Sequence, residues 1–167
     1  MLALGIDPGT AICGYGVVEM VGNKMTPLFY GAVFTDKTMA PEMRLKKIHE
    51  DITEIIQHFH PDIMSVEKLF FNRNVTTAIP VGQARGVVLL AAAQQNLPIL
   101  EFTPMQIKLA VVGYGKADKE QVTFMVQRIL GIKDKPKPDD VADALAMAIC
   151  GLNMAYSTRW TEVLQPK

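Results

Sequence analysis

The fold is decided at the start of the chain, by the stretch Leu4-Gly5-Ile6-Asp7-Pro8-Gly9-Thr10. Residues 1–6 are a short apolar run of the length expected for a buried strand. Pro8 and Gly9 end that strand and turn the backbone, so Asp7 stands at its carboxyl end. In an open sheet, this edge is where ligands and metals bind. Asp-Pro-Gly is also ordinary turn chemistry, so Asp7 alone leaves a capping role and a functional role open.

Length, hydropathy and cysteine content fit a single cytoplasmic α/β domain. The 167 residues suffice for one domain with a sizeable core, and 49% of them are hydrophobic. No apolar run reaches the length of a membrane span, and no signal peptide precedes the first strand. We therefore expect no membrane contact. Cys13 and Cys150 lie far apart in apolar segments and are expected to be reduced core residues.

The charges balance overall but are unevenly distributed along the chain. The 17 basic and 17 acidic residues give a formal net charge of zero, so composition supplies no general argument for nucleic-acid binding. Basic residues gather between 108 and 137, and acidic residues gather between 42 and 54. This distribution is compatible with a local basic surface beside an acidic pocket, and it leaves the partner open.

The apolar and turn patterns predict a mixed sheet flanked by helices. The first three strands are expected to form an antiparallel meander, because a turn at Gly22-Asn23 joins two alternating segments. A helix then leads into a short apolar strand, which a right-handed crossover places in parallel pairing. The predicted strands cover 1–6, 13–20, 25–34, 63–66 and 98–102, and the predicted helices cover 41–59, 75–95, 104–111, 118–130 and 139–156.

A second carboxylate repeats the arrangement seen at Asp7. Residues 63–66 form a short apolar strand, and Glu67 stands at its carboxyl end. If the crossover places this strand beside the first one, Asp7 and Glu67 lie close together. The alternative is a surface Glu67 paired with Lys68.

Two further carboxylates stand at the start of the last predicted helix. Asp140 and Asp143 are three residues apart, so they share a face at the helix N-terminus. A favourable interaction with the helix dipole would explain one or two acids at this position. It would not explain why Asp143 interrupts the apolar run 141–149. A carboxylate on that face needs a compensating partner, for which a divalent metal is well suited.

The four carboxylates together point to metal-assisted chemistry. Clustered carboxylates without Cys or His partners suit hard cations such as Mg²⁺ or Mn²⁺. Two such ions about 4 Å apart can activate a water and stabilise the leaving oxygen in phosphodiester cleavage. The sequence shows neither a nucleophile with a base nearby nor a Walker-type phosphate loop. The candidate ligands are Asp7, Glu67, Asp140 and Asp143.

Two other features leave structural and binding roles open. The predicted loop 69–74 carries two adjacent Phe residues, of which one is expected in the core, whereas an exposed one could contact a dimer partner or stack on a base. Ala78, Gly82 and Gly86 give the helix over 75–95 a smooth face at four-residue spacing. This face could be a dimer seam or could pack on the chain's own sheet.

Five segments occur in an order that resembles the RuvC family of bacterial Holliday-junction resolvases. They are Leu4-Gly-Ile-Asp-Pro-Gly-Thr10, Val66-Glu-Lys-Leu-Phe-Phe-Asn-Arg-Asn74, Gly82-Gln-Ala-Arg-Gly86, Val111-Val-Gly-Tyr-Gly-Lys116 and Val141-Ala-Asp-Ala-Leu-Ala146. The resemblance covers residues 1–156, expected to be one nuclease domain, and leaves 157–167 as a tail that we expect to be mobile. It implies an RNase H-like α/β fold with a mixed five-stranded sheet flanked by helices.

The same resemblance implies an activity and its partners. Members are expected to be homodimers that cut a four-way DNA junction by paired nicks in recombination and repair, working with the RuvA–RuvB branch-migration complex. They are expected to depend on Mg²⁺, with two ions per subunit and Mn²⁺ as a substitute. Asp7, Glu67, Asp140 and Asp143 match the family's acidic tetrad, although some relatives carry His at position 140. Asp139 is a neighbouring acid that could compete as a ligand.

The resemblance also suggests which residues meet the DNA. Phe70 matches the aromatic residue expected to insert against bases at the junction centre. Lys108 and Lys119 match basic residues expected to contact phosphates near the scissile bond. Further DNA-binding candidates are Arg73, Arg85 and Lys116.

Three alternatives to a junction nuclease remain at this point. The segment 5–10 resembles the first phosphate loop of actin-like ATP-binding proteins, although those have two such domains and a second phosphate loop. A non-catalytic junction-binding module would be expected to lack a carboxylate, whereas all four are present. A nuclease of the same fold could act on RNA–DNA hybrids or plain duplexes, and only the resemblance around Phe70 and the Gly82 helix favours the junction.

Overall fold

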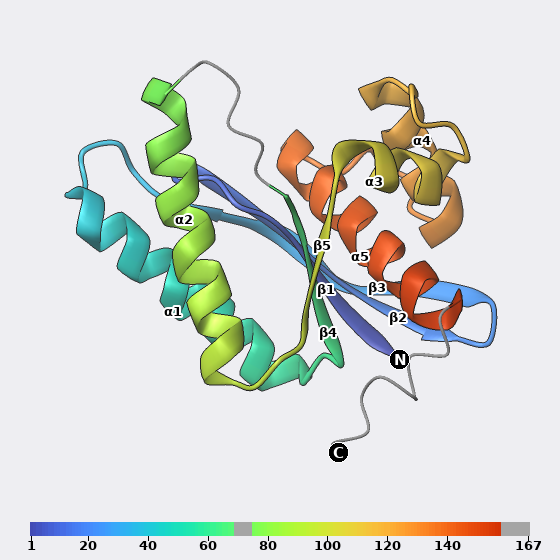
Figure 1. Ribbon diagram of the computed structural model, residues 1–167, viewed down its shortest axis with the longest axis horizontal. Coiled ribbons are helices and arrows are strands. Elements are labelled where there is room, and N and C mark those ends of the chain that lie inside the picture. Colours follow the sequence, from blue (N-terminus) through green and yellow to red (C-terminus); the bar gives the residue numbers. More distant parts are fainter. Residues whose placement is uncertain (69–74, 158–167) are drawn as a thin grey trace.

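A computed structural model describes residues 1–68 and 75–157 of the chain (Figure 1). In chain order the elements are β1 (Leu2–Asp7), β2 (Ile12–Val21), β3 (Lys24–Phe34), α1 (Pro41–Phe59), β4 (Ile63–Glu67), α2 (Val75–Gln94), β5 (Ile99–Phe102), α3 (Pro104–Val112), α4 (Lys119–Leu130) and α5 (Asp139–Ser157). Every predicted strand and helix is present, and the ends of each shift by at most one residue. The tail predicted for 157–167 begins with the last residue of α5, and the rest of it lies outside the described residues.

Five strands form one mixed sheet in the order β3-β2-β1-β4-β5. β1 pairs antiparallel with β2, and β2 pairs antiparallel with β3, which confirms the predicted meander. β4 runs parallel to β1, with Val66 opposite Ile6, and β5 runs parallel to β4. The carboxyl ends of β1 and β4 therefore meet at one edge of the sheet.

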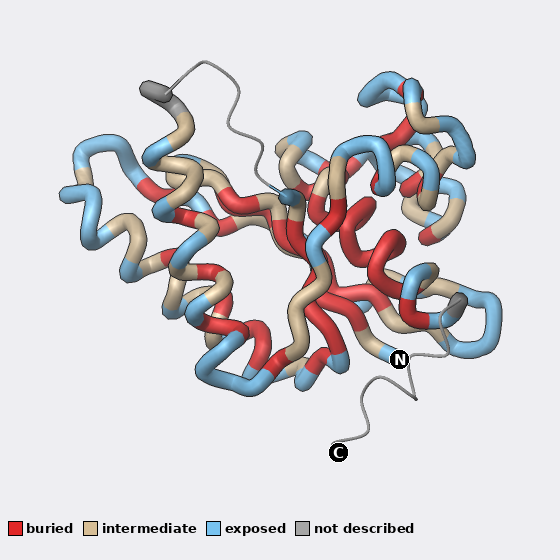
Figure 2. The backbone as a smooth tube through the Cα atoms, viewed as in Figure 1, coloured by how far each residue is buried: buried red, intermediate tan, exposed pale blue. Residues whose placement is uncertain are grey.

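Helices cover both faces of this sheet (Figure 1). Leu4 and Ile6 of β1 pack in the core that lies under α1 and α2. Ala3 packs in the core on the opposite face of the sheet, with Leu145 of α5 and with residues of α3 and α4. Burial is concentrated in the central strands and in α5 (Figure 2). In the described part of the chain, no helix is long and apolar enough to cross a membrane.

Glycines on β1 and β2 let α5 lie directly on the strand backbones. A Cβ atom on Gly5 would collide with the backbone carbonyl of Ala144, and one on Gly14 would collide with the backbone carbonyl of Asp140. Because neither position carries a side chain, the helix can approach this closely. The approach brings the first turn of α5 to the carboxyl end of β1.

The smooth face predicted on α2 points away from the chain's own sheet. The α2 residues that pack in the core are Ala84, Val88, Ala91 and Ala92. A Cβ atom on Gly82 or Gly86 would meet nothing within 4 Å, and Ile79 on the same side is 60% exposed. Of the two roles left open by the sequence, packing on the sheet is therefore excluded.

Cys13 and Cys150 are both buried and free, as predicted. Cys13 packs in the core under α1 and α2, and Cys150 packs in the core on the α5 side. Burial raises the pKa of each thiol to about 12, so both are protonated at neutral pH. These thiols are therefore unreactive core groups.

Candidate functional site

Four carboxylates come together where β1, β4 and α5 meet. Asp7 and Glu67 are the last residues of β1 and β4, and the residues before them, Ile6 and Val66, are paired partners. Asp7 also pairs with Gly14 of β2, and the main chain of Asp140 lies directly against Gly14. Asp143 follows one turn later on α5. The sheet register and the close approach of α5 thus assemble the predicted cluster.

The pKa of Asp7 reflects the presence of the other three carboxylates. Burial, and after it the charges of Asp143, Asp140 and Glu67, together raise the pKa of Asp7 to about 7. Burial, followed by the charge of Asp143, also raises the pKa of Glu67. Partly desolvated like charges repel one another, and a cation placed among them would relieve that repulsion.

One cation of the chain already reaches the cluster. Lys119, the first residue of α4, places Nζ 2.9 Å from Oδ2 of Asp143 and 3.6 Å from Oδ2 of Asp139. Lys135 reaches the other carboxylate oxygen of Asp139 at 3.5 Å. Asp143 therefore has the compensating partner that its sequence position called for. Asp139 thus pairs with two lysines at longer distances.

The donor set fits a hard divalent cation. All four candidate ligands offer carboxylate oxygens, the hard donors that suit Mg²⁺ and Mn²⁺, and Asp7 and Glu67 are partly removed from water. Among the described residues, no three acidic, His or Cys side chains yet lie close enough together to hold one ion. An ion at this place would therefore draw the side chains inward and compete with Lys119 for Asp143.

A small cavity of about 210 Å³ opens beside the cluster. Its lining combines two of the carboxylates, Glu67 and Asp143, with two of the predicted phosphate-binding residues, Lys108 and Lys119. The remaining lining is apolar and comes from α3, α4 and α5. The acidic site and its basic rim are thus adjacent, although the acidic residues that gather between 42 and 54 in the sequence lie on α1 and do not line this cavity.

The comparisons with known proteins agree with this geometry. The sequence model of the family described as "Crossover junction endodeoxyribonuclease RuvC" matches residues 3–151. The chain belongs to the RuvC family. A RuvC from Alkaliphilus oremlandii is 51% identical over 167 residues, which is 100% of both chains. A RuvC from Heliobacterium modesticaldum is 56% identical over 160 residues, which is 96% of this chain and 97% of the relative.

Solved structures of RuvC proteins share the fold. The structure of Thermus thermophilus RuvC in complex with Holliday junction substrate superimposes with a TM-score of 0.90 at 38% sequence identity. The match covers 95% of this chain and 96% of that one. The RNase H-like fold expected from the resemblance, with its mixed five-stranded sheet, is therefore confirmed.

Membership of the RuvC family removes the actin-like alternative. The segment 5–10, which resembles a phosphate loop, forms the end of β1 and the turn after it. In the described chain it presents Asp7 to three other carboxylates, which would repel a nucleotide phosphate. This part of the RuvC fold is therefore an acidic site.

Arg85 forms its polar contacts inside the domain, next to Glu67. Its Nε atom donates a hydrogen bond to the main-chain carbonyl oxygen of Glu67 over 3.3 Å. Its guanidinium also lies 2.9 Å from Oε2 of Glu101 on β5, and its side chain is only 15% exposed. This geometry favours a role in positioning Glu67 over the DNA contact that the sequence suggested. The sequence did contain a hint of this pairing: Glu101 is an acidic residue in the middle of a short apolar strand, where it needs a partner.

The other DNA-binding candidates differ in what the structure says of them. Lys116 is exposed in the turn between α3 and α4 and does not line the cavity beside the carboxylates. Phe70 and Arg73 lie outside the described residues. Their roles in RuvC chemistry stay predictions.

Proposed function

We propose that the chain is a structure-selective endonuclease that resolves Holliday junctions by paired, symmetric, metal-dependent hydrolysis of phosphodiester bonds. The observation that carries this proposal is the convergence of Asp7, Glu67, Asp140 and Asp143 in a member of the RuvC family. Support for the substrate comes from the T. thermophilus relative, which was solved with Holliday junction DNA. The reaction would serve homologous recombination and DNA repair.

We propose Mg²⁺ as the cofactor, with two ions per subunit and Mn²⁺ as a substitute. Asp7, Glu67, Asp140 and Asp143 would hold it, because they offer only hard oxygen donors in a partly desolvated setting. When bound, such ions activate a water and stabilise the leaving oxygen. Asp7 must lose its proton to act as a ligand, and its pKa of about 7 makes that loss pH-dependent near neutrality.

The rim of the site would position the DNA. Lys108 and Lys119 line the same cavity as Glu67 and Asp143, so each can meet a phosphate that lies over the carboxylates. Lys119 would leave Asp143 when a cation takes its place, and its ammonium group would then be available to the phosphate. Lys116 and Arg73 would contribute contacts further out, and Phe70 would insert against the bases at the junction centre.

We propose that the enzyme acts as a homodimer through the outer face of α2. That face carries Ile79 and Leu90, which are 60% and 49% exposed, with Gly82 and Gly86 between them. A two-fold dimer would present two identical sites to a junction that has two-fold symmetry itself. We also propose that the enzyme cooperates with the RuvA–RuvB complex in the cytoplasm, and membership of the RuvC family supports this proposal.

The test is a cleavage assay on a synthetic immobile four-way junction. A linear duplex and an RNA–DNA hybrid serve as competing substrates, and EDTA replaces Mg²⁺ in a parallel series. We expect symmetric nicks in the junction alone, only with metal, and no nicks from Asp7→Asn. Comparable cleavage of the duplex or hybrid would contradict junction selectivity. Binding without nicking, across several junction sequences and with Mn²⁺ also tried, would contradict the nuclease.

A further inference from the structure

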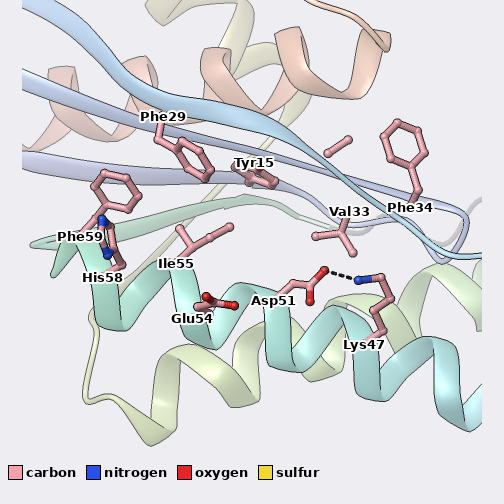
Figure 3. Close-up of a pocket in the computed structure, with 11 residues that line it drawn as sticks. Tyr15, Phe29, Val33, Phe34, Lys47, Asp51, Glu54, Ile55, His58 and Phe59 are labelled. Atoms are coloured by element: carbon pink, nitrogen blue, oxygen red, sulfur yellow. Dashed lines mark hydrogen bonds and ion pairs between the residues drawn. The ribbon is translucent and has the colours of Figure 1, made fainter.

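A second groove lies between the sheet and α1, and none of the four candidate metal ligands lines it (Figure 3). Its volume is about 740 Å³. We call it the β3–α1 groove and define it by Tyr15, Phe29 and Val33 on the strands and Asp51, Glu54 and Phe59 on α1. The proposed nuclease reaction uses none of these residues.

The floor of the β3–α1 groove is a partly open stack of aromatic rings. The ring centroids of Tyr15 and Phe29 are 5.3 Å apart, and those of Phe29 and Phe59 are 5.2 Å apart. The Tyr15 ring can lie across β3 because position 31 is glycine, where a Cβ atom would sit 2.7 Å from the tyrosine hydroxyl. Phe29 is still 42% exposed. The stack therefore keeps aromatic surface available to another apolar group.

The α1 wall of the groove carries an excess of negative charge. Asp51 and Glu54 both line it, and Lys47 forms an ion pair with Asp51 at 2.7 Å (Figure 3). Among the described residues, no cation lies within ion-pair distance of Glu54. A ligand with a positive group beside its apolar one would match this wall.

The strand wall of the groove is the edge of the sheet. β3 pairs with β2 on one side, and no described strand pairs with its other side. Pro27 lies near the start of β3, and beyond it Leu28, Tyr30 and Phe34 remain exposed. An exposed apolar edge strand offers unpaired main-chain N–H and C=O groups to an added strand.

We propose that the β3–α1 groove is a docking site for an extended peptide segment of a partner protein, one that carries a large apolar side chain flanked by Lys or Arg. The segment adds to β3 through main-chain hydrogen bonds. Its apolar side chain contacts the ring of Phe29, and its basic side chain meets Glu54. The proposal stands independently of the nuclease function.

Two other occupants fit the groove less well. DNA would bring phosphates against Asp51 and Glu54, and like charges repel. A second copy of the chain, docked groove to groove, would bring the same two carboxylates against themselves. A cationic peptide meets neither obstacle.

The test uses the full-length chain labelled with ¹⁵N and a set of short acetylated peptides as probes. The peptides follow the pattern Thr-Lys-Val-X-Val-Lys-Thr, where X is Leu, Phe, Tyr or Trp, and control peptides carry Glu in place of each Lys. We expect the cationic peptides to shift the amide signals of β3 and α1. We expect Glu54→Lys to weaken that binding about threefold to tenfold, the scale of one exposed charge reversed.

Matched variants separate the proposed contact from general effects. Glu42→Lys makes the same charge change on the same helix but does not line the groove, so it should bind the peptides as the unmodified chain does. Glu54→Lys should leave junction cleavage unchanged, which shows that the fold is intact. The proposal is overturned if no cationic peptide shifts β3, if the Glu peptides bind equally well, or if Glu42→Lys weakens binding as much as Glu54→Lys. It is also overturned if the β3 signals shift on concentrating the protein alone, because that would indicate a second copy in the groove rather than dimerisation through α2.

Discussion

Lys119 and Asp143 form an ion pair in which Nζ lies 2.9 Å from Oδ2. The hydrogen bond to Asp143 raises the pKa of Lys119, so the lysine stays charged. Lys119 in turn partly offsets the burial and the neighbouring carboxylates that raise the pKa of Asp7. The lysine therefore acts as the internal counter-ion of the carboxylate cluster, and a cation that binds Asp143 must compete with it.

We expect Lys119→Ala to tighten Mg²⁺ binding while it weakens junction binding. Removing the competing ammonium group frees Asp143, and the gain in Mg²⁺ affinity should be up to about fivefold, as for a half-exposed ion pair. Loss of one phosphate contact should lower the slope of log K against log salt by about one unit. Titration calorimetry measures the first effect, and anisotropy of a labelled junction over a salt series measures the second. Lys24→Ala, on the distant β2–β3 hairpin, is the control, and an unaltered salt slope would contradict the phosphate contact.

We expect the metal-free chain to lose stability as the pH rises from about 4 to 7. Asp7 has a folded pKa of about 7 against an ordinary value of 3.8, so in this window the folded state binds a proton that the unfolded state does not. The free energy of unfolding then falls as the pH rises, by between about 1 and 4 kcal/mol over the window. Thermal unfolding in EDTA at several pH values measures this fall.

Asp7→Asn isolates the contribution of this carboxyl group. The amide keeps the shape but carries no charge, so the variant should be more stable than the unmodified chain at pH 8 and nearly equal at pH 4. It should also abolish cleavage and retain junction binding, because the basic rim remains. Equal stability of the two proteins at pH 8 would show that burial and the neighbouring carboxylates do not destabilise the charged form of Asp7. Retained cleavage would exclude Asp7 as a ligand.

We expect Arg85 to affect catalysis through the position of Glu67. Its hydrogen bond to the Glu67 carbonyl oxygen and its ion pair with Glu101 link α2, β4 and β5 beside the site. Arg85→Ala should therefore lower kcat about tenfold to a hundredfold, as loss of groups that orient metal ligands does, with little change in KM. Mn²⁺ affinity, measured by calorimetry without DNA, should fall in parallel.

Two companion variants distinguish this positioning role from direct DNA contact. Arg85→Lys should recover part of kcat and of the Mn²⁺ affinity, because an ammonium group can still reach one acceptor. Glu101→Gln should lower kcat and the Mn²⁺ affinity, as Arg85→Ala does. Glu101 is an anion and would not bind DNA, so this effect would come from the position of Arg85. A rise in KM at constant kcat would instead support the DNA contact suggested by the sequence.

Local signals in the sequence predicted the fold and the proximity of Asp7 and Glu67. Alternation and turn residues located the strands, and local capping boxes at Thr103 and Asp118 begin α3 and α4. Asp7 and Glu67 could be placed together because each ends an apolar strand and a crossover makes those strands parallel. These inferences depend only on neighbours in sequence and on general rules of chain topology.

The contacts that complete the site depend on packing between distant segments. Nothing near Lys119 in the sequence identifies Asp143 as its partner, because the pair forms only when α4 packs against α5. The buried face of α2 could not be predicted either, because a helix that is apolar all round has no unique inner face. Val88 faces the core, whereas Leu90 of the same helix is 49% exposed. The role of Phe70 stays a prediction from family resemblance.

We expect the exposed face of α2 to form the dimer seam, so that Leu90→Glu yields a monomer. Leu90 is 49% exposed, so the change should leave the fold intact while it places a charge against its own copy. Leu109→Glu on α3 is the matched control, because Leu109 is 48% exposed and lies on a different helix. Sedimentation velocity should show a monomer for the first variant and a dimer for the second. The monomer should still bind Mg²⁺ but should no longer nick both strands of a junction together. If Leu109→Glu gave the monomer and Leu90→Glu the dimer, the dimer interface would lie on α3 instead.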